Sequence, residues 1–190
     1  MLSATKTAVR NTYGQSDTVT YIVSIVNSGT TPITGISVTD NLGEYTFGTT
    51  TLVPLTYIDG TVKYYVNGVL QPSAVVTAGP PLVVSGITVP AGGSVTVVYE
   101  AAVNEFAPLD TTSVINNTAI VAGTGITPIT AEEEITVEST PVLTITKSVS
   151  PVPVTENGTL TYTFLIQNSG NVAADASTGV VVTDVFDPVL

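Results

Sequence analysis

The sequence predicts an all-β protein built around an antiparallel β-sandwich. Thr and Val, both β-branched and suited to a pleated surface, make up about a third of the 190 residues. Apolar and polar residues alternate in several segments, and turn residues separate these segments at a spacing of roughly 8–12 residues. No stretch of a dozen residues shows the periodicity of a helix. We therefore expect sheets and almost no helix.

The alternation defines the strands in chain order. The alternating apolar positions are Val19, Tyr21, Val23 and Ile25; Ile36 and Val38; Val95, Val97, Tyr99, Ala101 and Val103; and Ile115, Ala119 and Val121. Turn signals between them are Asn27-Ser28-Gly29, Asp59-Gly60 and Pro90-Ala91-Gly92-Gly93. The pair Asn67-Gly68, between Tyr64-Tyr65-Val66 and Val69-Leu70, predicts a hairpin with a two-residue turn.

The chain also contains an internal repeat, which appears when Lys6 is aligned with Lys147. With this offset, Thr20-Tyr21 matches Thr161-Tyr162 and Asn27-Ser28-Gly29 matches Asn168-Ser169-Gly170; after a three-residue insertion, Val38-Thr39-Asp40 matches Val182-Thr183-Asp184. Long repeats of this kind indicate modules in tandem. The sequence predicts a first domain at 1–138, a linker at 139–141 and the start of a second copy at 142–190.

The second copy holds the equivalents of only the first three strands, so we expect that it cannot close a sandwich by itself. It would be completed by downstream sequence or by a neighbouring subunit through strand addition. The run Glu132-Glu133-Glu134 near the boundary is most simply a solvated strand edge that blocks association between sheets. Calcium binding is the alternative for this run.

Composition excludes several classes of function. The chain has no His, no Cys and no Trp, which removes the imidazole base, the thiol nucleophile, disulfides and conventional zinc, copper or iron–sulfur sites. Its net charge of -11 would repel a phosphate backbone, so nucleic acid is not an expected partner. The longest apolar run, Ala119 to Ala122, is too short to span a membrane. We expect no cofactor and no metal.

Five blocks in a fixed order carry a family resemblance. They are a Lys on the first strand, the segment Thr18–Gly29, Val38-Thr39-Asp40-Asn41-Leu42, Pro90–Ser94 and Asn116-Asn117-Thr118-Ala119. Together they resemble the bacterial surface-repeat family catalogued as domain of unknown function eleven. The resemblance covers the first copy and the start of the second. It implies an immunoglobulin-like β-sandwich, repeated in tandem in cell-wall proteins, adhesins, S-layer-like coats and some spore appendages.

Three polar residues take positions that the alternation assigns to the core. Lys6 shares a strand face with Leu2, Ala4 and Ala8; Asp40 shares one with Ile36 and Val38; Asn117 lies between Ile115 and Ala119. Lys147 and Asp184 take the same positions in the second copy. A buried, unpaired lysine costs several kcal/mol, so we expect Lys6, Asp40 and Asn117 to meet in the core.

Intramolecular isopeptide bonds, known in Cna-type pilus and adhesin domains, give one reason for such a cluster. They form between a Lys on an early strand and an Asn or Asp on a late strand, beside a buried carboxylic acid. Lys6, Asn117 and Asp40 match these roles, since apolar surroundings favour the neutral, nucleophilic amine. Glu100 is the alternative acid, but it shares a face with Thr96 rather than with Tyr99. The simpler alternative is a Lys6–Asp40 ion pair with Asn117 hydrogen-bonded, or a bulge that breaks the alternation.

These observations favour a non-enzymatic structural module of a bacterial extracellular surface or filament assembly. The expected partners are neighbouring repeats or other copies of the chain, and the expected location is the bacterial cell surface or spore surface. The alternative is an adhesin-type module that binds a glycan or a host protein. Tyr57, Tyr64 and Tyr65 near the Asn67-Gly68 hairpin could stack on a sugar, although cross-strand packing is the commoner use of Tyr.

Overall fold

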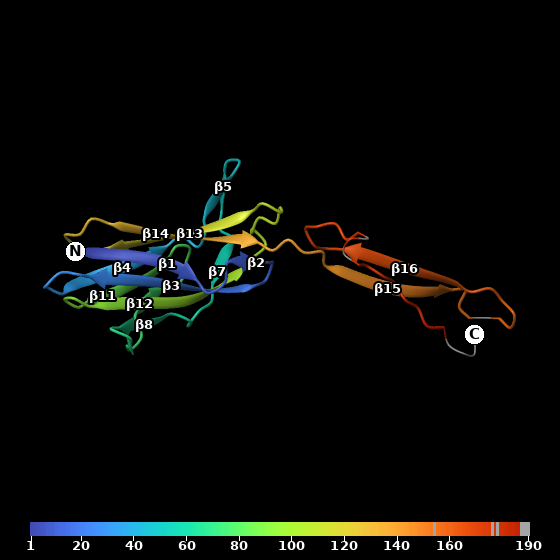
Figure 1. Cartoon of the computed structure of the whole chain (residues 1–190), viewed down its shortest axis with the longest axis horizontal. Helices are drawn as coiled ribbons and strands as arrows, with labels where there is room; N and C mark the ends of the chain where they lie inside the picture. Colours follow the sequence, from blue (N-terminus) through green and yellow to red (C-terminus); the bar gives the residue numbers. More distant parts are fainter. Residues whose placement is uncertain (154, 176, 178, 187–190) are drawn as a thin grey trace. The chain divides into compact units, whose positions relative to one another are not determined.

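The computed structural model describes residues 1–153, 155–175, 177 and 179–186. The chain divides into two compact units, Met1–Glu138 and Ser139–Leu190, and each is described by itself. Figure 1 shows that the regular elements of both are strands. Within the described part of the chain, no helix has the length and apolar content needed to cross a membrane.

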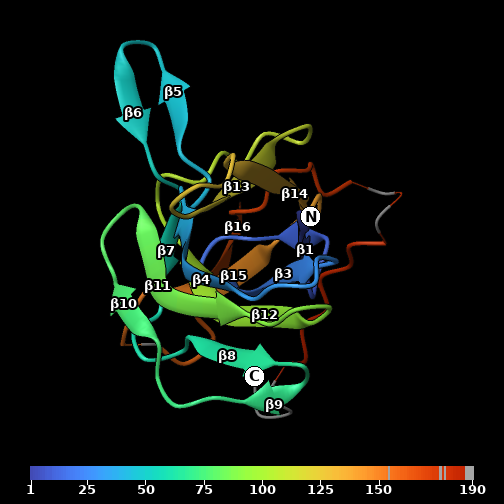
Figure 2. The ribbon, with the colours of Figure 1, turned by 90° about the vertical axis from the view of Figure 1, so that its left-hand side faces the viewer.

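The first unit is a sandwich of two sheets (Figures 1 and 2). One sheet has the order β1 (Leu2–Ala8), β3 (Thr18–Asn27), β12 (Ser94–Val103), β8 (Lys63–Val66) and β9 (Val69–Leu70), with β7 (Leu55–Tyr57) also paired to β12. The other has the order β10 (Val75–Thr77), β11 (Leu82–Val89), β4 (Ile33–Asp40), β13 (Val114–Ala122), β14 (Ile129–Val137) and β2 (Thr12–Tyr13). The hairpin of β5 (Tyr45–Phe47) and β6 (Thr50–Leu52) projects from the sandwich in Figure 2.

The core lies between the two sheets, and period-two alternation fills it. In β3 and β12 every second side chain is buried, while the residues between them are half-buried or exposed. All pairings in the sandwich are antiparallel except the short contact of β14 with β2. The predicted all-β sandwich is therefore confirmed, and its strands extend the alternating segments by at most three residues at either end.

Two turns follow the predicted chemistry. Asn67 and Gly68 join β8 to β9 with positive φ angles of 48° and 79°, as a two-residue turn that matches the strand twist requires. Asn27 closes the turn after β3, because its Oδ1 accepts from the Gly29 N–H at 3.0 Å. The Asn27 Nδ2 atom donates to the Thr31 carbonyl at 2.8 Å. Asn27 is thus a turn residue although it is buried.

The acidic run lies on β14. β2 pairs only with Thr136 and Val137, so within the described chain the Glu132–Glu134 segment is hydrogen-bonded to β13 on one side and has no ladder partner on the other, where β1 lies nearby. Among the described residues, no group of three carboxylates is arranged to hold a metal ion.

The second unit contains one antiparallel pair, β15 (Leu143–Ser150) and β16 (Thr161–Asn168). The third strand expected near Val182 is not formed: residues 179–186 follow a path without ladder pairing. In the first unit the equivalent strand, β4, is held between β11 and β13. Among the described residues of the second unit, no strand borders residues 179–186 as β11 and β13 border β4.

The backbone at Gly43, just after β4, is packed too tightly to accept a side chain. Its φ is +75°, and a Cβ at this position would lie 2.6 Å from Cγ2 of Ile115 and 3.1 Å from Cγ of Pro54. Gly35 has a similar φ of +68°, but nothing lies within 4 Å of its Cβ position. We predict that Gly35→Ala lowers the free energy of unfolding by about 1 kcal/mol through backbone strain alone. Gly43→Ala would lower it by roughly 1–3 kcal/mol more, because overpacking is added.

Urea unfolding of the two variants measures this difference, provided that the slope with urea concentration is unchanged. Equal losses in the two variants would mean that the backbone beside Ile115 yields, and would contradict the tight closure described for Gly43.

Candidate functional site

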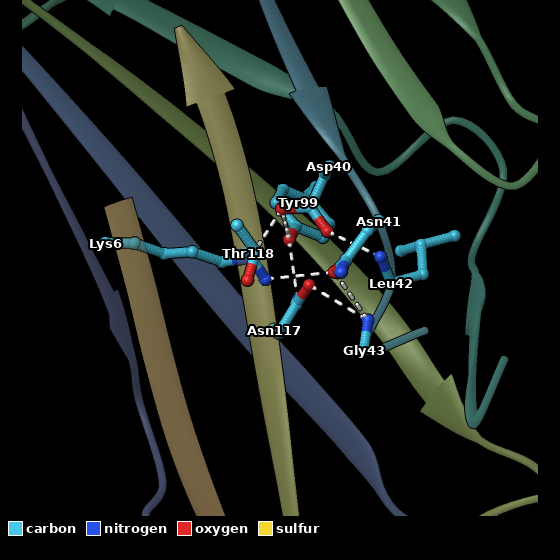
Figure 3. A network of polar contacts seen from close by, with 8 residues as sticks. All are labelled: Lys6, Asp40, Asn41, Leu42, Gly43, Tyr99, Asn117 and Thr118. Atoms are coloured by element: carbon cyan, nitrogen blue, oxygen red, sulfur yellow. Dashed lines mark hydrogen bonds and ion pairs between the residues drawn. The ribbon is translucent and has the colours of Figure 1, made fainter. Parts of the chain in front are cut away.

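The core of the first unit contains a cluster of buried polar side chains. Lys6 is 4% exposed, Asp40 1% and Asn117 0%. Lys6 comes from β1, Asp40 is the last residue of β4 and Asn117 comes from β13, so both sheets contribute. The structure thus brings together the three residues that the alternation pattern singled out, as Figure 3 shows.

Asp40 is the centre of the cluster. The Nζ atom of Lys6 donates to Oδ2 of Asp40 at 2.6 Å, and the hydroxyl of Tyr99 donates to the same oxygen at 2.5 Å. The backbone N–H of Leu42 donates to Oδ1 at 3.0 Å. Both carboxylate oxygens are therefore satisfied, which a buried charge requires.

Asn117 is held by two different groups. Its Nδ2 atom donates to the Tyr99 hydroxyl at 3.1 Å, and its Oδ1 atom accepts from the backbone N–H of Gly43 at 3.2 Å. Asn41 fixes the same turn, since its Oδ1 accepts from the N–H of Gly43 and from the N–H of Thr118, both at 3.0 Å. The side-chain amide of Asn117 is thereby fixed in orientation, with its carbonyl facing a backbone donor (Figure 3).

Tyr99 is the member of the network that sequence reasoning missed. It lies on β12 at a core position among valines and alanines, so the pattern assigned it to apolar packing. Its ring does pack there, stacked on Tyr21 with a centroid separation of 5.6 Å. Its hydroxyl nevertheless links Asp40 to Asn117. The available signal was that a buried tyrosine hydroxyl needs a polar partner.

Tyr21 lies beside the lysine. The Nζ atom of Lys6 is 4.9 Å from the centroid of the Tyr21 ring, which is a cation–π distance. The Tyr21 hydroxyl is buried near Asn117 but makes no hydrogen bond of normal geometry within the described residues. Tyr21 and Tyr99 therefore form a pair of stacked rings of which only one uses its hydroxyl.

Burial dominates the electrostatics of the cluster. It lowers the pKa of the Lys6 amine from its ordinary value of 10.5 to about 8, even though the neighbouring Asp40 carboxylate favours the charged form. Burial also raises the pKa of Tyr99 well above its ordinary value, with Asp40 adding to the effect. The neutral, nucleophilic form of Lys6 is consequently accessible at mildly alkaline pH.

Glu100, the alternative acid, lies elsewhere. It is half-buried on β12 opposite Thr20, on the strand face away from Tyr99. None of the described hydrogen bonds joins its side chain to Lys6 or Asn117. Asp40 is therefore the carboxylate that contacts the lysine.

The second unit repeats part of the cluster in a more exposed form. Lys147 donates to both carboxylate oxygens of Asp184, at 2.7 and 2.9 Å, and its Nζ lies 4.4 Å from the ring centroid of Tyr162. The side chains of Lys147 and Asp184 are 38% and 23% exposed, against 0% and 1% for Lys6 and Asp40.

The tyrosines considered for sugar stacking do not form one exposed platform. Tyr57 is 8% exposed and belongs to the hydrophobic core, whereas Tyr64 and Tyr65 are half-buried on β8. An open cavity of about 360 Å³ lies near β6 and β7, lined mainly by apolar residues that include Leu42, Leu55 and Phe106. Its lining contains no charged side chain.

No protein-family model matches the chain, and no curated protein matches its sequence. Three solved structures with a similar fold are pilins. RrgB, the pilus backbone of Streptococcus pneumoniae, is 14% identical with a TM-score of 0.51, over 64% of this chain and 31% of that one. A variant of BcpA, the major pilin subunit of Bacillus cereus, is 11% identical with a TM-score of 0.56, over 90% of this chain and 56% of that one.

SpaD, the major pilin of Corynebacterium diphtheriae, is 16% identical with a TM-score of 0.53, over 84% of this chain and 40% of that one. At such identities the likeness shows the fold alone, and it confirms the immunoglobulin-like β-sandwich. The chain spans between 31% and 56% of the length of these three pilins.

The two stacked tyrosines provide a matched test of the network. We predict that Tyr99→Phe lowers the free energy of unfolding by roughly 1–3 kcal/mol, because Asn117 loses its acceptor and Asp40 loses a donor. Tyr21→Phe should be neutral or slightly stabilising, because the buried Tyr21 hydroxyl makes no hydrogen bond of normal geometry with a described residue. Chemical denaturation compares the two, and similar losses would show that the hydroxyl of Tyr99 is unimportant.

The lowered pKa of Lys6 predicts a pH dependence of stability. Folded Lys6 loses its proton near pH 8, whereas unfolded Lys6 keeps it up to about 10.5, so the unfolded state binds more protons between these values. Stability should therefore rise with pH in this window, by about 2 kcal/mol between pH 8 and pH 10. The measurement compares the free energy of unfolding with that of a Lys6→Met, Asp40→Leu variant, in which both charges are absent, at each pH.

Both proteins in this comparison carry Asn117→Ala, so that Lys6 remains a free amine. Tyr21 and Tyr99 are present in both. Burial, which is the main cause of their raised pKa values, does not depend on Asp40, so both hydroxyls stay protonated in the two folded proteins between pH 8 and pH 10 and their titration largely cancels in the difference. A difference in stability that is constant from pH 8 to pH 10 would contradict the lowered pKa of Lys6.

Proposed function

We propose that this chain is a non-enzymatic, load-bearing module of a bacterial extracellular filament or surface assembly. The observation that supports this proposal most strongly is the buried cluster of Lys6, Asp40 and Asn117. The Lys6–Asp40 pair connects β1 to β4 of the opposite sheet, and the Tyr99 hydroxyl links Asp40 to Asn117 on the late strand β13. Pilins with the same fold support the same setting.

We further propose that Lys6 and Asn117 become joined by an isopeptide bond. The neutral amine of Lys6 attacks the side-chain carbonyl carbon of Asn117, a new C–N bond forms, the bond from that carbon to Nδ2 breaks, and ammonia leaves. Asp40 takes a proton from the attacking amine and returns it toward the departing nitrogen. No oxidant or cofactor is needed, because the reaction exchanges one amide for another.

The contacts of Asn117 suit this reaction. The Gly43 N–H already donates to Oδ1, where negative charge develops as the amine adds to the carbonyl. The Tyr99 hydroxyl bridges Asp40 and Nδ2, so it offers a path for the proton from the carboxyl group to the leaving group. We assign Tyr99 as the proton relay and Gly43 as the oxyanion donor.

The mechanical consequence follows from strand order. β1 is an edge strand, paired only with β3, and would be the first to peel away under tension. A bond from Lys6 to Asn117 would carry force from β1 directly into β13, and residues 7–116 would bear none of it. The edge strand would then no longer be the weak point of the module.

We place the module on the outside of a bacterial cell, with the spore surface as one such setting. We also propose that the chain belongs to the bacterial surface-repeat family catalogued as domain of unknown function eleven, which its five ordered blocks resemble. No family model matches the chain. The alternative function is a module that binds a glycan or a host protein. Tyr57 does not support sugar stacking in such a module, because its ring packs in the core.

Intact-mass measurement tests the bond. We predict that the purified chain is lighter than the sum of its residues by one ammonia. Lys6→Ala, Asp40→Ala and Asn117→Ala should each abolish this loss and lower the melting temperature. Asn116→Ala is the matched control, because Asn116 is exposed on the other face of β13 and should leave the loss intact. A wild-type mass equal to the residue sum would leave Lys6–Asp40 as a plain ion pair.

A further inference from the structure

The second unit reproduces the early part of the first in its strand register. β15 and β16 pair Leu143 with Asn168 and Val149 with Tyr162, as β1 and β3 pair Leu2 with Asn27 and Ala8 with Tyr21. The closing turn is also repeated. Asn168 accepts from the N–H of Gly170 at 3.0 Å and donates to the Val172 carbonyl at 2.7 Å, as Asn27 does with Gly29 and Thr31.

The repeated part exposes the surface that becomes core in the first unit. An open groove of about 320 Å³ is lined by apolar side chains that include Leu143, Ile145, Ile166, Val180 and Val182. By the internal repeat their counterparts are Leu2, Ala4, Ile25, Ile36 and Val38, which all pack in one hydrophobic cluster of the first unit. That cluster is completed by residues of later strands, among them Val95 and Val97 of β12 and Ala119 and Val121 of β13.

The Lys147–Asp184 pair lies beside this groove in the same arrangement as Lys6 and Asp40, but it is open to water. An exposed ion pair of this kind contributes little to stability, because water screens the attraction and both side chains lose conformational freedom. The partners that surround Lys6 and Asp40, Tyr99 and Asn117, come from β12 and β13. By the internal repeat, strands that bury Lys147 and Asp184 would carry a Tyr and an Asn in the positions of Tyr99 and Asn117.

We propose that the second unit is a receptor for a pair of extended strands with the pattern of β12 and β13, and that it joins Lys147 covalently to the Asn that they present. This inference rests on the proposed Lys6–Asn117 bond, because it applies the same reaction to the second copy. The occupant is a polypeptide segment with alternating apolar residues, a Tyr on one strand and an Asn on the other.

Strand pairing in the first unit sets the expected register. β13 pairs with β4 so that Ala119 lies opposite Asp40, and β12 pairs with β3 so that Tyr99 lies opposite Tyr21. The incoming strands would accordingly place an Ala opposite Asp184 and a Tyr opposite Tyr162. Residues 179–186, which make no ladder by themselves, would gain a strand neighbour and become the equivalent of β4.

The covalent step balances without an added reagent. The incoming strands exclude water from Lys147, and its neutral amine attacks the side-chain carbonyl carbon of the incoming Asn. A C–N bond forms to Lys147, the original bond to the amide nitrogen breaks, and one ammonia is released. Asp184 accepts the proton from the amine and delivers it to the leaving nitrogen.

A synthetic peptide of residues 94–122 provides the probe, since it contains β12, β13 and their own connection. We expect the full chain, incubated with this peptide, to form an adduct whose mass is that of the two components less one ammonia, with the modification on Lys147. An Asn117→Ala peptide should give no adduct, and neither should the Lys147→Ala chain. Asn116→Ala in the peptide is the matched control and should leave adduct formation unchanged.

The same spectra separate the two proposals. A chain that has lost one ammonia internally but forms no adduct with the peptide overturns the receptor and leaves the proposed Lys6–Asn117 bond intact. An adduct on Lys6 instead of Lys147 also overturns the receptor, since it would mean that the peptide had replaced the strands of the first unit. A chain with neither internal loss nor adduct overturns both.

Discussion

The buried ion pair between Lys6 and Asp40 is the constraint on which the first unit depends. Two charges removed from water are tolerated only when nearly every donor and acceptor around them is satisfied. Here β1 supplies the amine, β4 the carboxylate, β12 the Tyr99 hydroxyl and β13 the Asn117 amide. The pair thus requires four strands from two sheets to be in register simultaneously, which makes the sandwich specific as well as closed.

The backbone of the turn after β4 supplies two of the hydrogen-bond donors that the buried cluster needs. Leu42 and Gly43 both have positive φ angles, and this conformation directs their N–H groups to Asp40 and Asn117 respectively. Gly43 also has no room for a side chain, because Ile115 and Pro54 lie against it. The same few residues close the core and orient the polar groups, so a change that relaxes packing here would also disturb the hydrogen bonds to Asp40 and Asn117.

Much of this arrangement could be predicted from the sequence, for a physical reason. Alternation in a strand assigns each residue to a face, and Lys6, Asp40 and Asn117 share faces with apolar neighbours. Alternation could not identify Tyr99 as a member of the polar cluster. Its ring fits an apolar core position, and nothing in the pattern indicates where its hydroxyl makes hydrogen bonds. The alternation pattern did not reveal β11 for another reason. Its register against β4 shifts between Val84 and Ile87, where Gly86 has a φ of +78°, and this bulge breaks the period of two.

The two Lys–Asp pairs of the chain compare one interaction in two environments. Both ammonium groups contact a carboxylate and a tyrosine ring at similar distances, yet only Lys6 and Asp40 are withdrawn from water. The early strands are therefore sufficient to form the pair, whereas the late strands supply its burial. Since burial lowers the pKa of Lys6, the ease with which its amine loses a proton depends on residues distant in sequence. Closing of the sandwich and the lowering of this pKa are consequently one event.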